Sequence, residues 1–152
     1  TRTANKNSQQ EQPTGECAVA GSGRQFGMAR VSGPSMTPTL IDGDRVLVRY
    51  GVAIRPGSVV VLAHPTRADL LLIKRAVRRQ RDGRWWVLGD NPYAGGDSTD
   101  FGAVPAELIA ARALLRVAAP PPRPGLRARL RWARTAVRRL RPAPAAGPGG
   151  GA

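Results

Sequence analysis

Cysteine and histidine are scarce in this chain, which has one of each among its 152 residues. Cys17 has no second cysteine with which to form a disulfide bond, and one cysteine with one histidine falls short of the ligands that a zinc site needs. A Ser-His-Asp triad would have to use His64, which directly precedes Pro65 and is more typical of a loop histidine. The composition therefore excludes a disulfide framework, and we expect neither a metal site nor a cofactor.

Long apolar segments are also missing. Crossing a bilayer takes about 18–20 apolar residues, and the longest apolar run in residues 1–27 is Cys17–Ala20. We therefore expect no signal peptide and no membrane anchor in that segment. The localisation that follows is cytoplasmic, at most peripheral at the inner face of the membrane.

Acidic residues are absent after Glu107, although the whole chain has a net charge of +14. Residues 1–118 contain 16 basic and 10 acidic residues, which leaves +6, and residues 119–152 contain eight arginines. A domain that binds nucleic acid through its fold would spread basic and aromatic residues over that fold. We therefore expect no specific nucleic-acid site, and a basic tail whose partner is an anionic surface.

Three segments differ in composition. Residues 1–27 are polar and predict a disordered leader, and residues 28–118 are patterned for one modest core. Residues 119–152 are rich in proline, arginine and glycine. Within the middle segment, Gly, Pro and Asp turns separate short apolar runs, which predicts a mostly β domain. The expected strands are 28–31, 45–50, 58–62, 70–78, 84–88 and 113–117, with one helical turn at 105–109.

The basic tail also contains a helical repeat. Its apolar residues recur at spacings of 4, 3, 4 and 3, which predicts an amphipathic helix over 126–141: they are Leu126, Leu130, Ala133, Val137 and Leu140. Arginines occupy the other faces, and the proline run 120–122 separates the helix from the core. Such a helix can lie on an anionic membrane surface; the alternative is a solvated tail without a specific partner.

The chemistry is concentrated in the segment Gly33–Leu40, which places Ser35 on a proline-flanked turn. Lys74 follows the apolar run Leu70–Ile73. A serine hydroxyl is a poor nucleophile until a base takes its proton, and a lysine can be that base when burial lowers its pKa. A serine on a turn and a lysine in an apolar strand together predict a serine–lysine peptidase.

Further short motifs follow Ser35 in a fixed order: Gly43-Asp44, Lys74-Arg75, Gly89-Asp90-Asn91 and Asp97-Ser98. In this order they resemble the sequence boxes of the type I signal peptidase (S26) family of serine–lysine peptidases. The resemblance implies that family's mostly β catalytic core, with Ser35 as nucleophile and Lys74 as general base. It also implies a loop held together by Asp90, Asn91 and Asp97, and a Met36 that packs either near the substrate cleft or in the core.

Two departures from the family pattern leave helper groups undefined. Gly33 stands where some members have a hydroxyl that completes the oxyanion hole, so Ser32 is the remaining candidate beside the Ser35 backbone N–H. Gly95 stands where many members have a serine that orients the lysine. We expect Ser98 or Thr99 to orient Lys74 instead.

The loop Gly89–Gly102 resembles that of a narrower group, the nickel-type superoxide dismutase maturation proteases, as do Arg45–Gly51 and Trp85–Leu88. This resemblance implies a serine endopeptidase that removes the leader of the nickel superoxide dismutase precursor. The first alternative is a general type I signal peptidase that cleaves secretory signal peptides. A self-cleaving repressor would have to cut Ala20-Gly21, too close to Ser35 to reach it, and a basic nucleic-acid-binding domain would leave the ordered motifs unexplained.

Overall fold

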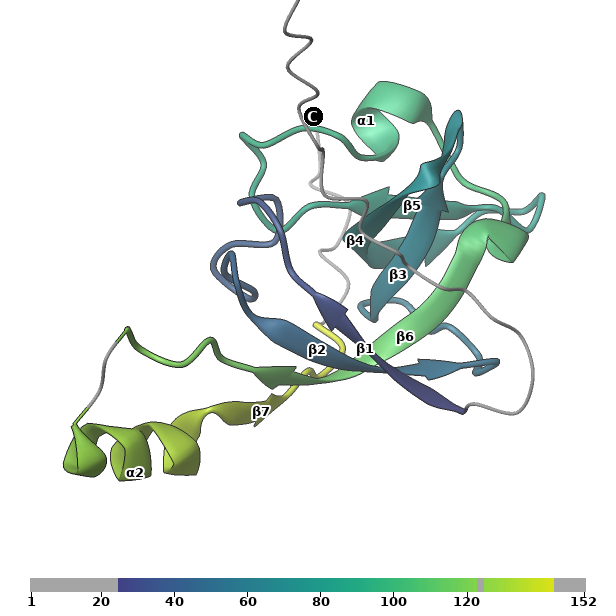
Figure 1. Cartoon of the computed structure of the whole chain (residues 1–152). Helices are drawn as coiled ribbons and strands as arrows, with labels where there is room; N and C mark the ends of the chain where they lie inside the picture. Colours follow the sequence, from purple (N-terminus) through teal and green to yellow (C-terminus); the bar gives the residue numbers. More distant parts are fainter. Residues whose placement is uncertain (1–24, 123–124, 144–152) are drawn as a thin grey trace, which may run out of the picture.

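The computed structural model describes residues 25–122 and 125–143, which form one antiparallel seven-stranded sheet with short helices at its periphery (Figure 1). The prediction of a mostly β fold is confirmed. Six strands lie in the order β1-β2-β6-β3-β4-β5, and β7 pairs with β6. The strands are β1 (Phe26–Arg30), β2 (Arg45–Tyr50), β3 (Val59–His64), β4 (Arg67–Arg79), β5 (Trp85–Leu88), β6 (Ile109–Val117) and β7 (Val137–Arg139). The helices are α1 (Ser98–Phe101), the 3₁₀ turn η1 (Ala106–Leu108) and α2 (Leu126–Thr135).

Strand β3 lies inside the sheet, between β6 and β4, which explains its continuous apolar sequence. Its residues alternate between two clusters of buried side chains. Val59 and Val61 pack in a first cluster with Met36, Leu40, Val46 and Val48. Val60 and Leu62 pack in a second cluster with Ala76, Trp85, Val87 and Val104.

Lys74 lies on β4 on the face of the second cluster, opposite Val60 of β3. Its neighbours two residues away on the same face, Leu72 and Ala76, both belong to or pack against that cluster. The lysine therefore enters the protein from a position that strand alternation assigns to the core, and 2% of its surface is exposed.

Several predicted bounds are wrong because pairing, which sequence patterns do not report, extends the strands. β1 begins at Phe26, which pairs with Arg49, so the predicted leader overlaps the sheet by two residues. β4 runs over Arg67–Arg79 rather than 70–78, and β6 begins at Ile109 rather than 113 because its first residues pair with β3. Helix α1 was not predicted. Residues 1–24, most of the predicted leader, lie outside the described residues.

The C-terminal segment differs most from its prediction. The helix ends at Thr135 rather than 141, and Val137–Arg139 form β7. β3 pairs only with Ile109–Arg112 of β6, and β7 pairs with Leu115–Val117 farther along that strand. Leu140 then packs against the first core cluster. The expected separation of this segment from the core is therefore wrong for residues 136–140. They lie along the part of the β6 edge that β3 leaves unpaired.

Candidate active site

The Ser35 turn lies in the connection between β1 and β2. Val31 N donates to Asp44 O at 2.8 Å and Gly43 N to Val31 O at 3.0 Å, which closes the base of the connection. Met36 lies in the first core cluster and is 1% exposed, so of its two predicted roles it has the core one. Because Met36 is anchored in this way, the adjacent Ser35 remains half-buried at the surface.

The loop after β5 binds the Ser35 turn through the backbone. Asn91 N donates to Ser35 O at 3.0 Å, and Asn91 Nδ2 donates to Pro34 O at 3.3 Å. Gly89 lies so close that a Cβ atom there would come 2.6 Å from Ser35 O. Glycine is therefore required at residue 89 by the close approach of two backbone segments.

The same loop binds Lys74 a few residues later. Lys74 Nζ donates to Gly95 O at 3.1 Å. Gly95 and Gly96 have φ values of +61° and +66°, a conformation that residues with a Cβ rarely adopt. Asp100 accepts a hydrogen bond from Gly96 N. Two glycines and one carboxylate thus shape the turn that presents a carbonyl to the lysine.

The pKa of Lys74 lies below its ordinary value of 10.5, because burial disfavours the charged ammonium. The carboxylates of Asp97 and Asp100 oppose this effect and raise the lysine pKa. The net result is an amine that loses its proton more readily than a lysine in water, as a general base requires.

Asp97 joins two parts of the loop through three hydrogen bonds. Its carboxylate accepts hydrogen bonds from Gly89 N at 3.0 Å, Thr99 N at 3.0 Å and Thr99 Oγ1 at 2.7 Å. Burial acts to raise the pKa of Asp97, but these hydrogen bonds and the Lys74 charge outweigh it, so that pKa is lowered. Asp97 is therefore an anion that links the end of β5 to the start of α1.

Ser98 and Thr99, the expected partners of Lys74, bind other groups. Ser98 Oγ accepts from Val87 N at 2.9 Å, and Thr99 Oγ1 donates to Asp97. The group that Lys74 contacts is instead the carbonyl of Gly95, the residue at which the resemblance to signal peptidases leads one to expect a serine. A backbone carbonyl does here what the sequence suggested a side-chain hydroxyl would do.

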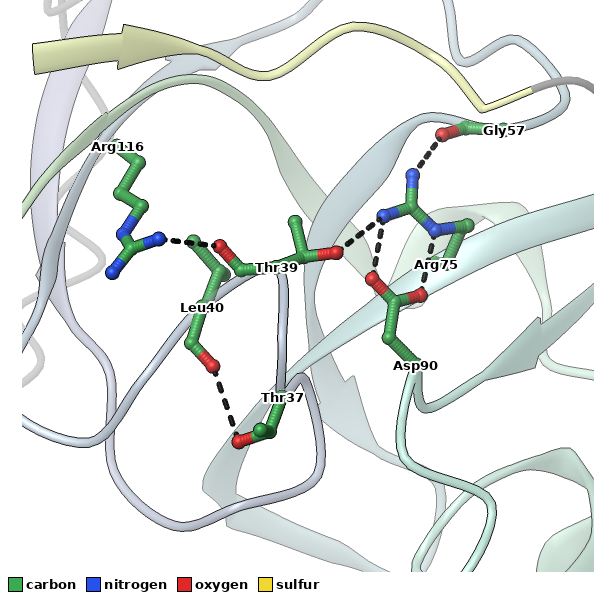
Figure 2. A network of polar contacts seen from close by, with 7 residues as sticks. All are labelled: Thr37, Thr39, Leu40, Gly57, Arg75, Asp90 and Arg116. Atoms are coloured by element: carbon green, nitrogen blue, oxygen red, sulfur yellow. Dashed lines mark hydrogen bonds and ion pairs between the residues drawn. The ribbon is translucent and has the colours of Figure 1, made fainter.

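Arg75, directly after Lys74, connects the turn and the loop (Figure 2). It forms a two-pronged ion pair with Asp90, with Nε–Oδ1 and Nη2–Oδ2 distances of 2.7 and 2.6 Å, and both side chains are 14% exposed. Its other donors reach Gly57 O at 2.7 Å and Thr39 Oγ1 at 3.4 Å. One guanidinium thus ties β4 to the Ser35 connection and to the Asp90 loop.

A second ion pair supports the base of the Ser35 connection. Arg116 Nε lies 2.7 Å from Asp44 Oδ2. Figure 2 shows the other contact of this guanidinium, in which Arg116 Nη1 donates to Thr39 O at 3.2 Å. Asp44 is 2% exposed and also accepts from Ile41 N and from Ala119 N. The aspartate of the Gly43-Asp44 motif thus has a structural role, because its carboxylate holds Arg116 and two backbone N–H groups.

The predicted oxyanion donors lie at the Ser35 turn, whereas His64 lies outside the site. Ser32 is exposed, and Gly33 N donates to Asp42 Oδ1 at 2.9 Å. Among the described residues, no acceptor receives the Ser35 N–H. His64 packs its ring edge-on against Phe101, with ring centroids 5.2 Å apart, and does not belong to this site.

Some groups of this site were not identified from the sequence. The sequence motifs include Arg75 only as the neighbour of Lys74 and predict no role for Asp100. At Gly95 they predict only a missing hydroxyl. The pair Gly95-Gly96 was the available signal, since two successive glycines often mark a turn with positive φ, but the partner of that turn lies 21 residues earlier in the chain.

Comparisons with known proteins agree with this architecture. The sequence pattern of Peptidase S24-like proteins matches residues 2–101. The mitochondrial ATP-independent inner membrane protease subunit 1a of Arabidopsis thaliana is 36% identical over 114 residues, covering 57% of this chain and 67% of that protein. Subunit 1 of the mitochondrial inner membrane protease of Schizosaccharomyces pombe is 31% identical over 115 residues, covering 60% and 73%, and the human subunit 1 is 27% identical. Neither α1 nor α2, the two α-helices in the described ranges, is long and apolar enough to cross a membrane. By its sequence match over most of the chain, the protein belongs to the Peptidase S24-like family.

Proposed function

We propose that this protein is a serine endopeptidase in which Ser35 is the nucleophile and Lys74 is the general base. The observation that carries the proposal is that one loop contacts both residues: Asn91 N binds the Ser35 carbonyl and the Gly95 carbonyl binds Lys74 Nζ. The low exposure of the lysine and the lowered pKa supply the second requirement, an amine able to accept a proton.

The proposed reaction proceeds by acyl transfer. Neutral Lys74 takes the proton of the Ser35 hydroxyl as the oxygen attacks the scissile carbonyl, and the protonated lysine then donates that proton to the leaving amine. The acyl group remains on Ser35 as an ester. Lys74, neutral again, takes a proton from water as the water oxygen attacks the ester. The ester bond then breaks and Lys74 returns the proton to the Ser35 oxygen, which releases the second product and the free serine.

The oxyanion of the tetrahedral intermediate needs hydrogen-bond donors in fixed positions. The backbone N–H of Ser35 is the first donor in this proposal, supported by its freedom from acceptors among the described residues. The exposed hydroxyl of Ser32 is the second, because Gly33 N is bound to Asp42. Loss of the Ser32 hydroxyl should lower kcat by about 10²-fold while leaving KM less affected.

The proposed substrate class is a precursor protein with an N-terminal leader. The resemblance of Gly89–Gly102 to the nickel superoxide dismutase maturation proteases supports the nickel superoxide dismutase precursor as the specific substrate. The second candidate is the activity of a general signal peptidase, favoured by the relatives named as inner membrane proteases. For the nickel superoxide dismutase precursor we propose a cytoplasmic site of action, at most peripheral at the inner face of the membrane.

The test is cleavage of purified precursors by the full chain. Ser35→Ala and Lys74→Met are expected to lower kcat/KM by about 10³-fold or more, as removal of a nucleophile or its base does. Lys74→Met keeps the length of the side chain and replaces a buried amine with an apolar group, so its thermal unfolding shows whether the fold survives. Thr66→Ala, which removes an exposed hydroxyl outside the site, is the matched control.

Normal activity of either dyad variant would refute the proposed mechanism. The substrate is tested separately, by comparing kcat/KM for the nickel superoxide dismutase precursor and for a secretory precursor in the same assay. Preference for the secretory precursor would replace the narrow substrate with the general one and leave the dyad intact.

A further inference from the structure

Helix α2 turns apolar side chains away from the rest of the protein. Leu126 and Leu130 lie one helical turn apart, on one face, and are 74% and 61% exposed. The contacts with the protein come from another face, where Trp132 Nε1 donates to Ala119 O at 3.1 Å and Ala136 at the helix end is buried. Figure 1 shows α2 extending from the sheet beyond β7. The leucines are thus not covered by any described part of the chain.

The charge around this face is of one sign. Residues 125–143 include no aspartate or glutamate and seven arginines, namely Arg127, Arg129, Arg131, Arg134, Arg138, Arg139 and Arg141. Within the described residues, none of these arginines forms an ion pair. By helical spacing, Arg127 and Arg134 lie along one border of the leucine face and Arg129 along the other. An apolar stripe with cations on both borders results.

We propose that α2 docks on the surface of an anionic phospholipid bilayer, with its two leucines inserted between the lipids and its arginines at the headgroups. A nucleic acid would satisfy the arginines but would leave the outward leucines in water, whereas a bilayer surface satisfies both. Charge complementarity and the direction of the apolar face thus favour the same partner.

The helix is connected to the proposed active site by a short series of hydrogen bonds. Ala118 N donates to Ala136 O at 2.8 Å, and Ala119 N donates to Asp44 Oδ1 at 3.1 Å. Asp44 in turn closes the base of the connection that carries Ser35. Docking therefore positions that connection relative to the membrane surface, a consequence that rests on the proposed peptidase function, whereas the docking itself does not.

Vesicle sedimentation with the full chain tests the docking. The wild-type protein should bind vesicles of phosphatidylcholine with 30% phosphatidylglycerol more tightly than vesicles of phosphatidylcholine alone, and salt should weaken the binding. Replacing two border arginines, Arg127→Gln with Arg134→Gln, should lower the affinity about thirtyfold. Leu126→Gln with Leu130→Gln should lower it at least about tenfold, and this loss should persist at high salt.

The matched control is Arg67→Gln with Arg81→Gln, which makes the same change of net charge at exposed residues of the β3–β4 and β4–β5 region. It should retain most of the binding. An equal loss in this control would overturn the docking site, because the effect would then belong to the overall charge. Unchanged binding of the leucine variant would overturn insertion, and tight binding to a DNA duplex that the leucine changes leave intact would reassign the surface to nucleic acid.

A cleavage assay distinguishes failure of the docking proposal from failure of the peptidase proposal. One precursor is offered free in solution and, in parallel, attached to the anionic vesicles through a lipid anchor. The leucine variant should cleave the free substrate like the wild type and the attached substrate more slowly. Vesicle binding without any cleavage would overturn the peptidase function alone, and equal cleavage of attached substrate by both proteins would overturn the link between docking and the site.

Discussion

The loop pair around Ser35 and Lys74 and the C-terminal α2–β7 segment are both rich in charge, but they place it differently. In the loop pair, Arg75 and Asp90 are 14% exposed and bind one another at 2.6 Å. In α2–β7, arginines surround outward-facing leucines and no acidic residue is near them in the sequence. The first arrangement uses charge to maintain a geometry, and the second leaves charge available to a partner.

This difference shows that a basic residue has no single meaning in this protein. A two-pronged arginine that is only 14% exposed is costly to remove because its partner, exposed to the same small extent, then lacks a counter-charge. An exposed arginine in water contributes little to stability. We therefore expect substitutions in the two regions to affect different properties. Changes in the loop pair should affect folding and catalysis, and changes in the C-terminal segment should affect binding.

The largest expected effect on stability comes from Arg75→Met. It leaves Asp90 without its cation and Gly57 O with only the Ala143 N–H at 3.3 Å, which should lower the free energy of unfolding by about 3 kcal/mol. Urea denaturation measures it. Asp82→Asn, at the exposed pair Arg84–Asp82 with a distance of 3.7 Å, is the control and should change stability by less than about 0.5 kcal/mol. Equal effects of the two substitutions would contradict the contrast drawn here.

A smaller but more localised effect is expected from Gly89→Ala. The new Cβ would meet Ser35 O at 2.6 Å, so the turn and the loop must move apart, at a cost of about 1–3 kcal/mol in stability. Peptidase activity should fall more than tenfold, since a displacement of about 1 Å can cost 10²-fold. Gly125→Ala, in a place with open space, should leave activity unchanged. A fully active Gly89→Ala enzyme would show that the turn does not depend on this contact.

Within the C-terminal segment, Leu140 and Leu130 should differ. Leu140 packs against the first core cluster, and its replacement by alanine should cost about 1–2 kcal/mol, below the range for fully buried leucines because it is half-buried. Leu130→Ala should cost less than about 0.5 kcal/mol, because that side chain is 61% exposed. Thermal unfolding of both variants decides whether β7 and the following residue belong to the fold, and equal melting temperatures would contradict this assignment.

The subtlest expected effect is on the pH dependence of cleavage. Activity should rise with pH as Lys74 loses its proton, through a pKa below 10.5 because burial disfavours the ammonium. The Asp100 carboxylate raises that pKa, so Asp100→Asn should move the rising limb of kcat/KM to lower pH. The asparagine oxygen can still accept from Gly96 N. Asp69→Asn, an exposed change earlier on β4, should leave the limb in place, and a shift to higher pH in Asp100→Asn would refute the assignment.

Much of the fold could be predicted from the sequence because its signals are local. The apolar run of β3 and the alternation of β2 each report on a strand and its immediate neighbours in the chain. The ordered motifs marked the residues that the structure gathers around one loop. The partner of Lys74 could not be predicted in this way. A carbonyl oxygen belongs to every residue, and only the turn at Gly95 aims one at the lysine.

The C-terminal segment shows the same limit. The spacing of Leu126, Leu130, Val137 and Leu140 satisfies a helix throughout. Val137–Arg139 instead form an exposed strand, and Leu140 packs against the first core cluster. The periodicity of a segment shows which of its faces could pack against a surface. It carries no information about an unpaired strand edge elsewhere in the protein. That edge belongs to β6, about 20 residues earlier in the chain.

By itself, the sequence determined the β-rich class, the turn around Ser35, the apolar strand that contains Lys74 and the charge of the tail, because each depends on residues close together in the chain. The tertiary structure alone decided that one loop contacts both the serine turn and the lysine, that Arg75 joins them through Asp90, and that β7 completes the edge of β6. Each of these depends on backbone groups or strand edges that meet only after folding, and such groups are identical in every residue until the fold positions them.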